Sequence, residues 1–148
     1  MKIYLDTNVA MDIFIGSDRT NYQYSIRILN AIDKTPGLTG LFSVQSLTDI
    51  AYSQTKYGQQ NRERFYRQAK TLLGILTLVT IAPSITKEAL KAQPKDFEDY
   101  EQILCAEEND CSWFVTGDEN LLKTYGESKE HIAVISPKVF LELASRKR

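Results

Sequence analysis

Cysteine, histidine and net charge are all scarce in this chain. Its 148 residues include two cysteines and one histidine, and 18 basic side chains are nearly balanced by 19 acidic ones. Cys105 and Cys111 are too few for a disulfide framework, and with the single His131 they do not suggest a zinc site. A net charge of −1 provides no global positive field, so any nucleic-acid partner would have to be held by local patches.

Long apolar runs are also missing. The sequence contains no stretch of about 18 apolar residues, and its opening Lys2-Ile3-Tyr4-Leu5 is strand-like and unlike a signal peptide. We therefore expect a cytoplasmic protein with no membrane contact. The length fits one domain over residues 1–148, with enough chain for a sizeable core.

Short apolar segments alternate with segments of helical periodicity. Strands are expected over 2–5, 38–43, 76–81, 113–116 and 132–135. Helices are expected over 10–15, 21–33, 45–57, 60–73, 84–92 and 97–109, shortly after 118, and from 136 to the basic tail 146–148. This alternation predicts parallel strands joined by right-handed crossovers, and hence a three-layer α/β/α fold. The pattern alone leaves the strand order open.

Carboxylates follow two of the expected strands. Asp6 ends the first strand, at the sheet edge where open α/β folds bind ligands, and Asp118 comes just after the fourth. The two would meet if strands one and four are neighbours. An alternative is that Asp6 or Asn8 only caps the next helix.

Two further acids lie on helices. Asp99 shares a helical face with Ile103 and Ala106, so it should lean toward the sheet, although Asp96 one turn earlier could be the cap of that helix. Asp49 follows the second strand and fits a solvated surface residue as well as a ligand.

Clustered carboxylates repel one another unless a cation neutralises them. Oxygen ligands without histidine or cysteine suit Mg²⁺ or Mn²⁺, which commonly bind substrate phosphates as well. The expected chemistry is therefore phosphoryl transfer or phosphodiester hydrolysis, with the cation activating water and stabilising charge on phosphorus.

In their order and spacing the acidic segments resemble the PIN domain family. They are Leu5-Asp6-Thr7-Asn8, Thr48-Asp49-Ile50, Phe97-Glu98-Asp99-Tyr100 and Val115-Thr116-Gly117-Asp118, and residues 132–140 resemble the family's last strand and helix. The resemblance implies a five-stranded parallel sheet of order 3-2-1-4-5. It also implies a Mg²⁺- or Mn²⁺-dependent endoribonuclease acting on RNA. Small members are often VapC-like toxins of type II toxin–antitoxin pairs, held by an antitoxin protein, and are commonly homodimers.

The resemblance also implies a role for each matching residue. Asp6, Asp99 and Asp118 would bind the metal, and Asp49 would complete the acidic set. Thr116, together with Thr7 or Asn8, would orient a carboxylate or a water. The family usually has glutamate where this chain has the shorter Asp49, which puts direct metal contact by Asp49 in doubt and favours action through water.

Other interpretations remain at this stage. The basic side chains and tyrosines of 52–70 could form an RNA path or simply a solvated helix face with aromatic edges in the core; they are Lys56, Arg62, Arg64, Arg67, Lys70, Tyr52, Tyr57 and Tyr66. A PIN-like scaffold that binds RNA or protein without cleaving it is the main alternative function. An aspartyl-phosphate phosphatase of the haloacid dehalogenase type is disfavoured, because it wants a second acid at the position of Asn8.

Overall fold

Five parallel strands form the centre of the molecule. The computed structural model describes residues 1–16, 18–56 and 58–147. The strands are β1 (Lys2–Leu5), β2 (Thr39–Ser43), β3 (Thr77–Val79), β4 (Trp113–Val115) and β5 (Ala133–Ile135), in the order β3-β2-β1-β4-β5. Each neighbouring pair is parallel. The expected order 3-2-1-4-5 is confirmed, and β1 and β4 are neighbours.

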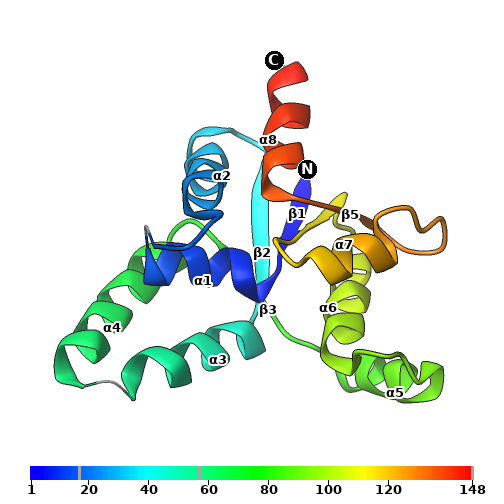
Figure 1. The fold of residues 1–148 in the computed structure, drawn as a ribbon, viewed down its shortest axis with the longest axis horizontal. Helices are drawn as coiled ribbons and strands as arrows, with labels where there is room; N and C mark the ends of the chain where they lie inside the picture. The colour runs from blue at the N-terminus through cyan, green and yellow to red at the C-terminus, as the bar shows by residue number, and fades with distance from the viewer. Residues whose placement is uncertain (17, 57, 148) are drawn as a thin grey trace.

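Helices cover both faces of this sheet. Figure 1 shows α1 to α4 on its left and α5 to α7 on its right, with both chain ends at the top. The helices are α1 (Thr7–Ile15), α2 (Tyr22–Lys34), α3 (Val44–Thr55), α4 (Gln59–Leu73), α5 (Pro83–Ala92), α6 (Phe97–Glu108), α7 (Glu119–Tyr125) and α8 (Pro137–Arg146).

Alternation along β1 divides the core in two. Ile3 and Leu5 face a cluster built with α1, α2, α3, α4 and α8, whereas Tyr4 faces a cluster built with α5, α6 and α7. In register, Tyr4 lies between Leu41 of β2 and Phe114 of β4. The Tyr4 and Phe114 rings stack with their centroids 5.2 Å apart. The three-layer α/β/α fold is therefore confirmed, with a separate apolar layer on each face.

Some element boundaries differ from the sequence prediction. Helix α1 begins at Thr7 and not at residue 10, because Asp6 caps it with its side chain. Strand β3 covers Thr77–Val79 and not 76–81. Helix α5 begins at Pro83 and not at residue 84, because a proline's missing N–H costs nothing at the first position of a helix. Two predicted helix ends, Tyr57 and Arg148, lie outside the described residues.

The cysteines and the lengths of the helices bear on two further expectations, that the chain has no disulfide framework and no membrane span. Both Cys105 and Cys111 are free thiols, and Cys105 is buried among apolar side chains. Within the ranges that the structure describes, every helix is too short or too polar to cross a bilayer.

Candidate active site

Asp6 is the most buried of the predicted site carboxylates. It follows β1, extends the sheet by donating its N–H to the carbonyl of Val115 at 3.0 Å, and is 6% exposed. Its Oδ1 accepts from Thr7 N at 2.8 Å, and its Oδ2 accepts from Thr116 Oγ1 at 2.8 Å and Asn8 Nδ2 at 3.0 Å. Burial raises the pKa of Asp6, and the charge of Asp118 raises it further, while these hydrogen bonds oppose the rise.

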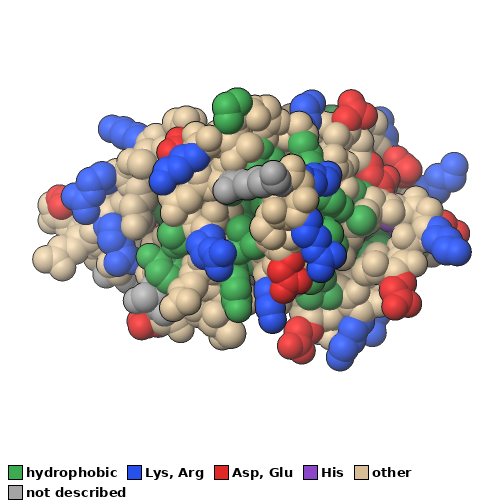
Figure 2. All heavy atoms as spheres, turned by 90° about the horizontal axis from the view of Figure 1, so that it is seen from above, with side chains coloured by type: hydrophobic (Ala, Val, Ile, Leu, Met, Phe, Trp, Pro, Cys, Tyr) green, Lys and Arg blue, Asp and Glu red, His purple; other side chains and the backbone are tan. Residues whose placement is uncertain are grey.

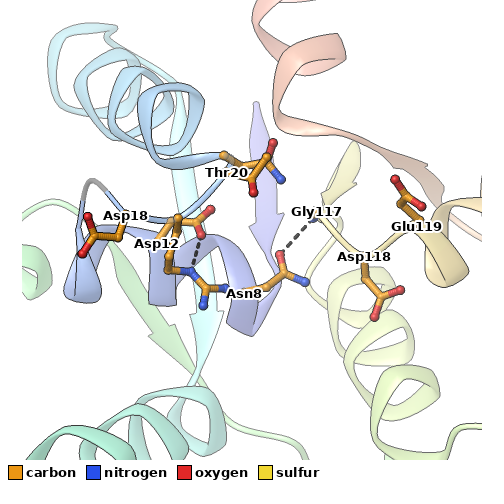
Figure 3. Close-up of a pocket in the computed structure, with 9 residues that line it drawn as sticks. Asn8, Asp12, Asp18, Thr20, Gly117, Asp118 and Glu119 are labelled. Carbon is orange, nitrogen blue, oxygen red and sulfur yellow. Dashed lines mark hydrogen bonds and ion pairs between the residues drawn. The ribbon is translucent and has the colours of Figure 1, made fainter.

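Thr116 connects the ends of β1 and β4. Besides bonding Asp6, its Oγ1 accepts from Asn8 Nδ2 at 3.1 Å and from Asp118 N at 3.0 Å. Asn8 Oδ1 in turn accepts from Gly117 N at 2.9 Å, the contact drawn as a dashed line in Figure 3. Of the two residues considered beside Thr116, Asn8 contacts Asp6 with its side chain, whereas Thr7 Oγ1 lies 2.6 Å from Ser46 Oγ.

Asp118 is the N-cap of α7. Its Oδ1 accepts from the backbone N–H groups of Asn120 and Leu121 at 2.8 and 3.1 Å. Its Oδ2 has no hydrogen bond to any described residue. One oxygen thus fixes the start of the helix and the other stays available to a ligand.

Asp99 lies in the first turn of α6, close enough to the other acids to be repelled by them. Burial raises its pKa to about 7, with further contributions from the charges of Asp6, Asp96, Asp118 and Glu98 in that order. Its carboxylate makes no hydrogen bond to a described residue. Asp96 is indeed the helix cap, since its Oδ1 accepts from Asp99 N at 2.9 Å.

Asp49 is less central than these three acids. It is exposed on α3, and its charge is the largest of those that raise the pKa of Glu98, after the effect of burial. The charge of Asp6 raises the pKa of Glu98 as well, so both Asp49 and Asp6 repel the Glu98 carboxylate. Sequence reasoning overlooked Glu98, although its position directly before Asp99 was a usable signal.

The side chains at this site offer carboxylate oxygens, which are the ligands that a hard divalent cation prefers. Within residues 1–16, 18–56 and 58–147, no three Asp, Glu, His or Cys side chains are arranged closely enough to form a ready-made ion site. The side chains whose charges affect one another are all carboxylates. Mg²⁺ or Mn²⁺ would neutralise the repulsion between them. A cation would therefore be held by carboxylates drawn from the ends of β1 and β4 and from the start of α6.

A buried polar network lies beneath these acids and joins three layers. Gln102 of α6 donates from Nε2 to Ser43 Oγ at 3.2 Å and accepts from the Tyr4 hydroxyl with Oε1. Ser43 caps α3 by accepting from Ser46 N at 3.0 Å. These four side chains are at most 1% exposed. The network fixes α6, which carries Asp99, against β1 and β2.

The basic segment 52–70 has features of both interpretations, an RNA path and a solvated helix face with aromatic edges in the core. Phe65, Ala69 and Leu72 of α4 are buried, whereas Tyr52 is 72% exposed. Tyr66 is 58% exposed, but its ring packs edge-on against buried Phe65, with the centroids 5.5 Å apart. Tyr57 lies outside the described residues. The segment keeps exposed rings and basic side chains together, as an RNA path would require.

The pKa of Asp99 predicts how the metal-free protein responds to pH. The native carboxyl holds its proton more tightly than the unfolded chain does, so between about pH 4 and 7 the native state binds more protons and its stability falls as pH rises. We expect a melting temperature in EDTA a few degrees higher at about pH 5 than at about pH 8. Asp99→Asn should remove most of that difference, and Asp33→Asn on the exposed side of α2 should not; equal slopes in all three proteins would contradict the cluster.

Thr116 offers a test of the hydrogen-bonded scaffold. Thr116→Val keeps the shape but removes bonds to Asp6, Asn8 and Asp118 N, so we expect a loss of about 1–3 kcal/mol in the free energy of unfolding. Thr116→Ser retains the hydroxyl and should lose less. Urea unfolding of the two variants measures this, and a valine protein as stable as the original would mean that the bonds contribute nothing.

Comparisons with known proteins agree with this fold. A family model described as PIN domain matches residues 2–120. No curated protein matches the chain.

Solved structures with a similar fold include bacterial and archaeal proteins. VapC20 of Mycobacterium tuberculosis, described as a sarcin-ricin loop cleaving toxin, superposes with a TM-score of 0.64 at 10% identity, over 82% of this chain and 94% of its own. VapBC2 of Rickettsia felis, bound to a DNA fragment from its promoter, gives 0.65 at 14% identity, over 92% and 98%. PAE2754 of Pyrobaculum aerophilum gives 0.60 at 14% identity, over 98% and 96%. At these identities the likeness concerns the fold.

Proposed function

The chain belongs to the PIN domain family, and we propose that it is a metal-dependent endoribonuclease that hydrolyses phosphodiester bonds of RNA. What supports the proposal is that the charge of Asp118 raises the pKa of Asp6, and that the charges of Asp6 and Asp118 both raise the pKa of Asp99. A scaffold without catalysis has no use for such repulsion, which costs stability. Mg²⁺ or Mn²⁺ is the proposed cofactor.

The protein's own residues would divide the work. Asp6, Asp99 and Asp118 would hold the cation, which when bound supplies activation of water and neutralisation of charge on the phosphate. Thr116 and Asn8 keep Asp6 in one orientation through their hydrogen bonds. Asp49, which is exposed on α3, would act through water.

The biological role extends the proposal. The likeness to the Mycobacterium toxin supports a toxin of a type II pair, with an antitoxin protein as partner, and a homodimer is the proposed assembly. The runner-up is a PIN-like scaffold that binds RNA or protein without cleaving it. What favours the runner-up is that the described side chains form no ready-made three-ligand ion site.

Incubation of the purified protein with a mixed pool of single-stranded RNA tests the proposal. We expect fragments with Mg²⁺ or Mn²⁺ and none with EDTA. Intact RNA under all conditions, together with a melting temperature that Mn²⁺ leaves unchanged, would favour the scaffold. Cleavage that persists in EDTA would contradict the metal dependence.

A further inference from the structure

Two cavities lie on either side of Asp118. One, of about 550 Å³, is bordered by Asn8, Arg19, Asn21 and Gly117 and by the carboxylates of Asp12, Asp18, Asp118 and Glu119, and Figure 3 looks into it. The other, of about 410 Å³, is bordered by Asp99 and Asp118 and by a second set of residues that includes Lys95, Lys123 and Tyr125. Both volumes are of the size that accommodates small ligands or single nucleotides. Both hollows are bordered by carboxylates, and they differ in their basic groups, a guanidinium in the first and two ammonium groups in the second.

The first cavity contains a fixed guanidinium. Arg19 Nε donates to Asp12 Oδ1 at 2.6 Å, and the other oxygen of Asp12 accepts from Ser25 Oγ at 2.7 Å. Asp12 is 4% exposed, so the pair is anchored in the protein. The terminal nitrogens of Arg19 bond to none of the described residues. They therefore present a planar, charged fork to whatever occupies the cavity.

Gly117 allows two amide side chains to border this cavity. A Cβ there would lie 2.8 Å from Asn21 Nδ2 and 3.4 Å from Asn8 Oδ1, so only glycine lets both amides approach the backbone. The amide of Asn21, like the fork of Arg19, has no hydrogen bond to a described residue. Paired donors and acceptors on a cavity wall are what reads the edge of an unpaired base.

The second cavity is bordered by two ammonium groups. Lys95 and Lys123 are exposed, and within the part of the chain that the structure describes neither has an ion pair. Both lysines border the same cavity as Asp99 and Asp118. Their positive charges would offset the repulsion between these carboxylates and a bound polyanion. Ammonium groups in such a place suit backbone phosphates, which carry no sequence information.

From this arrangement we propose that one single RNA strand crosses the site from cavity to cavity. The cavity of Arg19 takes an unpaired base next to the cleaved bond, and Lys95 and Lys123 bind phosphates on the other side. The inference rests on the proposed function and adds a base-reading residue, Arg19, and two phosphate-binding residues, Lys95 and Lys123. A duplex should bind more weakly, because its bases are stacked and paired and do not enter the cavity.

Binding is measured first, because it does not need cleavage. In an Asp6→Asn background, fluorescence anisotropy with a labelled single-stranded RNA reports affinity over a range of salt concentrations. Lys95→Ala/Lys123→Ala should weaken binding about tenfold and reduce the slope of log affinity against log salt by roughly 1.4, or about 0.7 for each lost contact. A hairpin duplex of the same composition should bind at least about tenfold more weakly than the strand.

A matched control is available at the opposite end of the molecule. Lys34 and Arg146 are exposed in the last turns of α2 and α8, and Figure 2, which views that end, shows basic side chains scattered among acidic ones. Lys34→Ala/Arg146→Ala removes the same charge and should change affinity less than about twofold. Equal losses in the two double variants would overturn the phosphate assignment.

The base-reading role is tested with abasic substrates. Arg19→Lys keeps the charge beside Asp12 but removes the fork, and it should fold even where Arg19→Met does not. In a substrate whose cleavage position has been mapped, loss of one neighbouring base should lower cleavage by the original protein about tenfold, and by Arg19→Lys hardly at all. A penalty that is unchanged in Arg19→Lys overturns the assignment while leaving the nuclease proposal intact. If the protein cleaves no RNA, the nuclease proposal fails. The anisotropy measurements still test the proposed path of the strand, because Arg19→Lys should lower the affinity for single-stranded RNA about fivefold.

Discussion

Asp6→Asn is expected to abolish RNA cleavage, with a loss of about 10³-fold or more. Asp6 supplies a negative charge that Asn does not, and a neutral amide is a poor partner for a divalent cation. The fold should survive, because burial already disfavours the charge and raises the pKa of this carboxyl. Single-turnover cleavage in Mn²⁺ measures the loss.

The melting temperature shows whether this variant loses activity because the metal site is changed or because the protein no longer folds. Without metal at about pH 8, Asp6→Asn should melt at or a few degrees above the temperature of the original protein, because a buried charge has been removed. Asp33→Asn makes the same chemical change on an exposed part of α2 and should affect neither property. Cleavage retained within tenfold by Asp6→Asn would contradict the role of Asp6 as a metal ligand.

Asp118→Asn is expected to have the second largest effect, a loss of about 10²-fold or more in cleavage. Asparagine caps helices as well as aspartate does, so α7 should keep its start and its bonds from Asn120 and Leu121. The substitution therefore removes charge at the site with little change in structure. The same single-turnover assay measures it, with circular dichroism as the check on folding.

Glu119 provides the control for that variant. It is the next residue, exposed, at the start of α7 and on the border of the same cavity, but it caps nothing. Glu119→Gln removes an identical charge from the same surface and should cost less than about threefold if only general electrostatics is affected. Similar losses in the two variants would mean that the negative field around the site matters and that Asp118 has no special position.

The sequence was most informative where local chemistry decides the outcome. The apolar run Ile3-Tyr4-Leu5 predicted a strand, which the structure shows between two apolar layers, and the inward face of the helix over 97–109 predicted that Asp99 turns toward the sheet. Strand order came from the family resemblance, because a periodic pattern does not say which strands pair. Asp6 turned out to be both a helix cap and a member of the acidic cluster, which the sequence had presented as alternatives.

Contacts between distant segments were out of reach. The pairing of Arg19 with Asp12 depends on how the residues after α1 fold back against α1 and α2, and Ser25 completes it from another helix. The bond from Gln102 to Ser43 joins residues on opposite halves of the chain. Neither contact carries a local signature, since glutamine in a helix and serine at the end of a strand are ordinary surface residues until tertiary packing buries them.

Mn²⁺ binding to the purified protein, measured by titration calorimetry, tests the central claim that Asp6, Asp99 and Asp118 form one divalent-cation site. We predict saturable binding by the original protein, at least tenfold weaker in Asp6→Asn and in Asp118→Asn, and unchanged in Asp33→Asn. Binding that is absent from the original protein, or equal in all four proteins, would contradict the claim.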